Sequence, residues 1–193
     1  MQQQTQSSDP VREFVIAGHG NLDKVKQMLH EHPEYLNVAY QWGEKDTETA
    51  IQAAAQVGNA PIAEFLLGEG APLEICTAAM LGRDSEVKRR LDENPTSAKA
   101  TGAHGIPLLP HAVWSGNARL VELVYNRGAT AGVNLALHNG IVRGNPEVVR
   151  WLLENAKPSI AAKNYQGKTP LSVASELKST EIVQLLKQHG ATE

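Results

Sequence analysis

The sequence predicts an all-α fold, a solenoid of six stacked helix-turn-helix repeats. A Gly-Asn pair occurs at residues 20–21, 58–59, 116–117 and 144–145, and an apolar stripe begins four to five residues after each pair. Such stripes are typical of amphipathic helices that bury one face. Aromatic residues make up only 5% of the 193 residues, so the core must be aliphatic and rich in alanine. A core of this kind suits closely packed helices better than a β-sandwich or a barrel.

The Gly-Asn pairs mark the turn between the two helices of each repeat. Glycine permits the tight turn, and asparagine can cap the start of the second helix. Gly82-Arg83 and Lys178-Ser179 occupy the same place in two weaker copies. The intervals between the six positions are 38, 24, 34, 28 and 34 residues, so long and short intervals alternate. Two helices this short cannot bury their apolar faces alone, and the repeats must therefore stack.

The chain divides into six repeats without a visible linker or second domain. We predict repeats at about 9–38, 39–73, 74–99, 100–131, 132–161 and 162–193, within a single domain that covers residues 9–193. Asp9-Pro10 supplies a cap and a first turn to a first helix over residues 11–17. The last helix is polar at several positions, as suits the end of a stack. Residues 1–8 are glutamine-rich and polar, and we expect a disordered tail there.

The last 30 residues, from Asn164 to Glu193, carry the clearest copy of the repeat. They read Gly167-Lys168-Thr169-Pro170-Leu171-Ser172-Val173-Ala174, then Glu181-Ile182-Val183-Gln184-Leu185-Leu186, then Gly190-Ala191. Thr169 can cap a helix, and Pro170 fits its first turn, where the missing N–H costs nothing. This stretch resembles one ankyrin repeat, whose family pattern is G-x-T-P-L-H-x-A-A…I-V-x-L-L…G-A. The resemblance covers about residues 9–193 and suggests a small stand-alone ankyrin protein, resembling those of bacteria.

The resemblance implies β-hairpin fingers between repeats, and the intervals decide where they fit. The long intervals leave room for fingers at about residues 40–48, 101–106 and 163–168. The short intervals leave no room, since residues 70–73 and 128–131 run almost directly into the next helix. We therefore expect fingers on alternate repeats only.

The resemblance implies a non-catalytic scaffold that binds a protein partner on its concave face. In the family this face is made of finger residues and the last turn of each first helix. Carried over position by position, the candidate partner-binding residues are Val57, Met80, Leu81, His104, Ile106, Trp114, Val142, Arg143, Tyr165 and Lys168. The central ones are mostly apolar, and an apolar patch with a polar rim indicates an interaction site. The alternative is that these side chains fold inward as additional core.

A second hypothesis is an enzyme or small-ligand protein with a groove pocket around His104, His111 and Trp114. A deep pocket under Trp114 would favour it, whereas a shallow groove would favour the scaffold. The seven histidines are scattered along the chain, and we expect neither a metal nor a cofactor. His138 stands where the family's repeat histidine does, and the resemblance implies that it bonds to neighbouring backbone. Trp151 lies among apolar residues and is predicted to be core.

Charge and cysteine content narrow the class of protein further. The net charge of −3 and a pI near 6.2 argue against a nucleic-acid partner. The single cysteine, Cys76, cannot form an internal disulfide, which fits a reducing compartment. No apolar run reaches membrane-spanning length, and the N-terminus lacks the apolar core of a secretory signal. We therefore expect a cytoplasmic monomer that binds neither nucleic acid nor a membrane.

Overall fold

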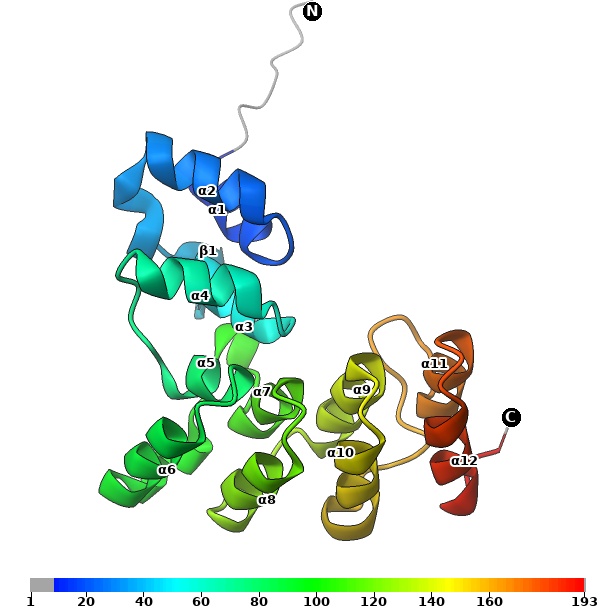
Figure 1. Cartoon of the computed structure of the whole chain (residues 1–193). Coiled ribbons are helices and arrows are strands. Elements are labelled where there is room, and N and C mark those ends of the chain that lie inside the picture. Colours follow the sequence, from blue (N-terminus) through cyan, green and yellow to red (C-terminus); the bar gives the residue numbers. More distant parts are fainter. Residues whose placement is uncertain (1–8, 193) are drawn as a thin grey trace, which may run out of the picture. The chain divides into compact units, whose positions relative to one another are not determined.

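The computed structural model describes residues 9–192, and the tail predicted for residues 1–8 lies outside this range. Within it, twelve α-helices form six consecutive pairs joined by short turns (Figure 1). The chain divides into two compact units, and each is described by itself. The predicted all-α architecture of paired helices is confirmed, while the single domain expected over residues 9–193 stays a prediction. None of the helices in residues 9–192 has both the length and the hydropathy that a membrane span requires.

Unit 1 contains the first two repeats, up to Leu73, and the short segment Ala103–Gly105. Its helices are α1 (Pro10–Gly18), α2 (Leu22–Glu31), α3 (Ala50–Gln56) and α4 (Ala60–Gly68), with 3₁₀ turns η1 (Pro33–Asn37) and η3 (Ala103–Gly105). Strands β1 (Tyr40–Gly43) and β2 (Asp46–Glu48) form an antiparallel hairpin in which Tyr40 pairs with Glu48. The first helices α1 and α3 pack against each other, which buries small residues such as Ala54 and Ala55.

Unit 2 contains the last four repeats. Its elements are α5 (Ile75–Met80), α6 (Asp84–Glu93), η2 (Pro95–Lys99), α7 (Leu108–Trp114), α8 (Ala118–Asn126), α9 (Val133–Arg143), α10 (Pro146–Trp151), the π-turn η4 (Leu152–Ala156), α11 (Pro170–Glu176) and α12 (Thr180–Gln188). The first helices α5, α7, α9 and α11 pack side by side in this order, and the second helices α8, α10 and α12 do the same (Figure 1). Unit 2 is therefore a stack of two helix layers, with aliphatic residues such as Leu137 and Ile141 fully buried.

The Gly-Asn pairs form the turns that the sequence predicts. The side chains of Asn21, Asn59, Asn117 and Asn145 each accept a hydrogen bond from a backbone N–H in the first turn of the second helix. Gly116, at φ 73°, lies in the left-handed region that glycine enters without steric cost. Asn145 makes a further hydrogen bond that the sequence does not predict: its Nδ2 donates to the Gly116 carbonyl at 2.7 Å. One side chain thus caps its own helix and ties it to the preceding repeat.

The fingers follow the predicted alternation, with decreasing regularity along the chain. The first is the β1–β2 hairpin, and the second contains a single bridge between Thr101 and Pro107. The third is a turn in which Asn164 N–H donates to the Lys168 carbonyl at 2.9 Å. The structure has no strand in residues 70–75 or 128–134, all of which it describes. The interval lengths therefore predict correctly which connections are too short for a finger, whereas of the three longer connections only the first forms a β-hairpin.

Candidate functional site

The candidate site in unit 2 is the surface made by the last turns of its first helices, which we call the first-helix face. It consists of Leu81, Trp114, Ser115, Val142, Arg143, Glu176 and Leu177. Val142 is 53% exposed and Leu177 is 50% exposed, although both are large apolar side chains. They end neighbouring helices, since α9 packs against both α7 and α11. The face therefore offers apolar area to solvent on successive repeats.

Arg143 and Trp114 lie together at the centre of this face. Arg143 Nε donates to the Trp114 carbonyl at 3.1 Å, so the guanidinium crosses from α9 to the end of α7. Trp114 is half-buried. Its exposure is therefore intermediate between the two alternatives from the sequence, an exposed partner-binding residue and a core residue. A guanidinium has five N–H donors, and this bond uses one of them.

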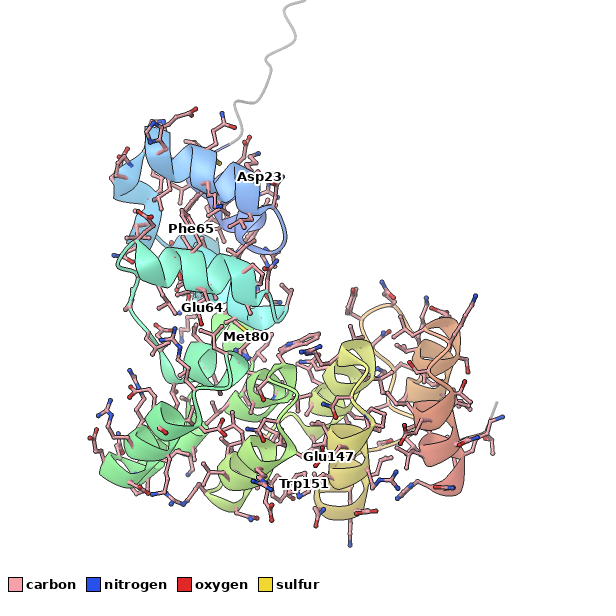
Figure 2. The ribbon with its side chains drawn as sticks, in the orientation of Figure 1. Asp23, Glu64, Phe65, Met80, Glu147 and Trp151 are labelled. Atoms are coloured by element: carbon pink, nitrogen blue, oxygen red, sulfur yellow. The ribbon has the colours of Figure 1, made fainter. Side chains whose placement is uncertain are left out.

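Met80 does not belong to the exposed surface. Its side chain is 2% exposed in helix α5, which packs against α7 (Figure 2). The expectation that Met80 contacts a partner is wrong, because its side chain is buried in the folded chain and offers almost no surface to a partner. The alternative of additional core is correct at this position. Its neighbour Leu81 is half-buried and remains part of the first-helix face.

The finger residues of unit 2 differ in how much they offer a partner. Tyr165 is 94% exposed, so nearly the whole ring is in solvent. Lys168 Nζ donates to Glu176 Oε2 at 2.6 Å, which ties the third finger to the end of α11. Ile106 is half-buried beside the second finger. Of these three residues Tyr165 is the most accessible, and their contact with a partner stays a prediction.

The remaining two predicted residues, Val57 and His104, belong to unit 1. Val57 is 38% exposed at the end of α3. His104 Nδ1 donates to Asp46 Oδ2 at 2.8 Å, and its Nε2 lies 3.5 Å from Glu48 Oε2. The His104 backbone is left-handed, at φ 55°, which is costly for a residue with a Cβ. Its contacts with the β2 carboxylates help to hold it there.

A charged cluster around Glu48 was not predicted as a group. Glu48 is fully buried, its Oε2 accepts from Trp42 Nε1–H at 2.8 Å, and its Oε1 lies 3.4 Å from His19 Nε2. The second contact is an ion pair rather than a full hydrogen bond. The Glu48 carboxylate raises the pKa of His19 against the opposing effect of burial. A protonated His19 compensates a buried negative charge that would otherwise be costly.

The alternation of these residues along the hairpin gave a usable signal. Trp42 lies on β1, and Asp46 and Glu48 lie on β2, so the hairpin brings these three residues close together, although Trp42 falls at the irregularity in the register and has no paired residue of its own. The histidines come from distant parts of the sequence and could not be assigned this way. Across residues 9–192, no three His, Cys, Asp or Glu side chains are arranged to share a metal ion. We therefore interpret the cluster as a link between η3 and the hairpin.

Comparison with known protein families and proteins finds ankyrin repeats in this chain. A profile described as ankyrin repeats (3 copies) matches residues 108–192, and a profile described as ankyrin repeat matches residues 46–78. The chain belongs to the ankyrin repeat family. An ankyrin repeat protein of fowlpox virus (strain NVSL) is 27% identical over 125 residues, covering 62% of this chain and 28% of the relative. The chain thus aligns with less than a third of that relative's length.

The ankyrin histidine of repeat five behaves as the resemblance implies. His138 is 6% exposed, and its Nε2–H donates to the Ala162 carbonyl at 2.8 Å. It bridges α9 to the segment before the third finger. This bond explains why a polar side chain is buried in the stack, because buried donors are normally satisfied.

His111, in the corresponding helix of ankyrin repeat four, is buried without such a partner. It is 1% exposed, and neither ring nitrogen has a hydrogen-bond partner. Burial lowers its pKa to about 4. The ring packs against Gly102 so closely that an added Cβ there would collide with it. His111 is therefore core, and the hypothesis of a groove pocket with His111 in its wall is not supported.

Proposed function

We propose that this ankyrin repeat protein is a scaffold that binds a protein partner on its concave face, with the first-helix face of unit 2 as the contact surface. The observation that carries the proposal is the exposure of Val142 and Leu177 beside Trp114 and Arg143. Ankyrin repeats generally mediate protein–protein interaction, and apolar side chains exposed on adjacent repeats suit that role. Loss of this area from water supplies the driving force for association.

Arg143 adds specificity to the proposed contact. Its Nε is occupied by the Trp114 carbonyl, and its two Nη groups make no hydrogen bond or ion pair with any residue described in the structure. An acidic or carbonyl group on the partner would pair with them, and bonds between charged groups are the strong ones. The anchored guanidinium is partly pre-organised, so less side-chain entropy is lost when the partner binds. Tyr165 and Lys168 would extend the contact along the third finger.

The proposal includes a non-catalytic role, since the family is typically non-catalytic. We further propose a cytoplasmic monomer whose ligand is a protein rather than a nucleic acid. The basic residues on or next to the first-helix face are few and do not form a continuous surface: Arg143, Lys168, which already pairs with Glu176, and Lys178 beside Leu177. A nucleic-acid site would need a continuous basic surface.

Affinity capture with two matched variants of the full chain tests the proposal. Val142→Glu places a charge on the first-helix face, and Leu135→Glu places one at the other end of the same helix, where Leu135 is 38% exposed. Partners that Leu135→Glu retains and Val142→Glu loses would support the proposed face. We expect Val142→Glu to weaken binding by about 1–2 kcal/mol. Equal capture by both variants and the wild type, with unchanged melting, would contradict it.

A further inference from the structure

A second surface of unit 2 lies on its outer helices, away from the residues of the first-helix face. A groove of about 200 Å³ runs between α8 and α10. It is lined by Ala118, Arg119 and Glu122 of α8 and by Glu147, Arg150, Trp151 and Glu154 of α10 and η4. Trp151, labelled in Figure 2, is half-buried here rather than core as predicted. The ring of Tyr125 meets it edge-on, with the ring centroids 5.4 Å apart. The Trp151 ring forms the aromatic part of the groove, and Tyr125 packs against that ring.

Unit 1 contains an equivalent groove whose aromatic ring is already covered. It lies between α2 and α4, and the ammonium of Lys26 is 5.5 Å from the centre of the Phe65 ring. Lys26 stands five residues after Asn21, and Phe65 stands six after Asn59. The lysine of one outer helix therefore supplies a cation to the aromatic ring of the next. Such cation–π contacts are attractive because the ring face is electronegative.

In unit 2 the same two positions hold a carboxylate and an aromatic ring. Glu122 stands five residues after Asn117, and Trp151 stands six after Asn145. A glutamate thus takes the place of the lysine, and no cation lies over the Trp151 ring among the residues described. Tryptophan binds cations better than phenylalanine does. The groove therefore contains the aromatic ring and the carboxylate of a cation-binding site, but no described residue supplies a cation to that ring.

The carboxylates around Trp151 outnumber the basic side chains that can neutralise them. Glu122, Glu147 and Glu154 make no ion pair with any side chain in residues 9–192. Of the two arginines in the groove, Arg150 lies 3.6 Å from Glu181 of the next repeat. Arg119 is then left to balance three carboxylates. The groove therefore favours a cationic occupant.

The neighbouring outer helix α6 shows that free carboxylates are not general on this surface. There, Lys88 pairs with Asp92 at 2.6 Å, and Arg89 pairs with Glu93 at 2.6 Å. Asp92 also receives Arg127 from α8 at 2.6 Å. Three acidic side chains of α6, Glu86, Asp92 and Glu93, are thus ion-paired within the chain, in contrast to those around Trp151.

We propose that the α8–α10 groove binds a lysine- or arginine-bearing segment of a protein partner, with the cationic head over Trp151 and beside the Glu122, Glu147 and Glu154 carboxylates. This surface is distinct from the first-helix face, so a partner can occupy both. The basic side chain does from outside what Lys26 does for Phe65 within unit 1. Desolvation of the cation against the Trp151 ring makes the contact stronger than an exposed ion pair.

An array of random twelve-residue peptides, probed with the full chain and its variants, tests this proposal. Trp151→Leu removes the ring, and Glu122→Lys supplies a cation in place, as at Lys26. Glu31→Lys makes the same charge change on α2, where Glu31 is exposed, and serves as the matched control. Val142→Glu, on the first-helix face, separates this groove from the proposed concave site.

We expect a set of peptides that bind the wild type, Glu31→Lys and Val142→Glu, and that lose binding to Trp151→Leu and Glu122→Lys. Each should contain a lysine or arginine whose replacement by glutamine weakens binding about tenfold, and added salt should weaken it further. Peptides that lose binding to Trp151→Leu and Glu122→Lys are groove-dependent. The proposal is overturned if such peptides lack a basic residue, or if norleucine replaces their lysine without loss of binding. It is also overturned if no peptide is groove-dependent. Self-association of the wild type that Trp151→Leu abolishes would also overturn it, because the occupant would then be a second copy.

Discussion

Acid should destabilise unit 2 through His111, and the size of the effect follows from its burial. The imidazole is 1% exposed with both nitrogens unpaired, and its folded pKa is about 4, compared with the ordinary value of 6.5. The unfolded chain therefore binds a proton between these two values that the folded chain does not. Stability is fully present above pH 6.5 and is lost as the pH falls towards 4. A difference of about 2.5 pKa units corresponds to roughly 3 kcal/mol.

Two non-titrating substitutions isolate this contribution. His111→Leu keeps a similar volume and removes the unpaired nitrogens, and His111→Gln keeps a polar group without a titration in this range. The free energy of unfolding is measured with urea at pH 7 and pH 4.5 for the wild type and both variants. Between these pH values the wild type should lose roughly 2–3 kcal/mol more than either variant. His111→Leu should be at least as stable as the wild type at pH 7, since it buries no unsatisfied donor.

Two results would contradict this account of His111. If both variants lose the same stability as the wild type between pH 7 and pH 4.5, His111 does not titrate as a buried neutral base. A strongly destabilised His111→Leu at pH 7 would show that the ring nitrogens are paired after all. Either result would contradict the account of His111 as a buried neutral base without a hydrogen-bond partner.

Three further outcomes follow from the contacts. Ala174→Leu should cost about 1–3 kcal/mol in chemical unfolding, because Ala174 is fully buried in α11; the same change at exposed Ser175 should cost much less. Asn145→Ala should lower stability by about 1–2 kcal/mol and by more than Asn21→Ala, since Asn145 also bonds to the Gly116 carbonyl; equal losses would remove that bond's role. His19 has a raised pKa, so its stabilisation of unit 1 is present below pH 6.5 and is lost as the pH rises through the folded pKa. His19→Gln should abolish this loss in melting curves between pH 6 and 8, and an unchanged pH dependence would contradict the ion pair with Glu48.

The sequence predicts the repeat architecture well because that architecture is local. A glycine and an asparagine at the turn, followed by an apolar stripe, specify a helix pair from about thirty consecutive residues. The finger positions follow from chain length alone, since residues 70–73 are too few for a hairpin. Neither the helix pairs nor the finger positions depend on which side chains contact each other across repeats.

The side chains that the sequence misplaced are those whose burial depends on the neighbouring repeat. Met80 and Val142 hold similar places on α5 and α9, yet Met80 is 2% exposed and Val142 is 53% exposed. Trp151 is surrounded by apolar residues in sequence but faces a groove with three glutamates. The Glu48 cluster joins His19, the hairpin and His104, which are far apart in the chain. Patterns within one repeat carry no information on these contacts.

Hydrogen–deuterium exchange of the full chain, alone and with a captured partner, tests the central claim most directly. The proposed scaffold predicts slower exchange in the last turns of α7, α9 and α11, at residues 114–116, 142–144 and 176–178, when the partner is bound. Protection at the α8–α10 groove can accompany this without replacing it. A partner that protects only the outer helices α8, α10 and α12, or only unit 1, would contradict the claim that the first-helix face of unit 2 is the contact surface.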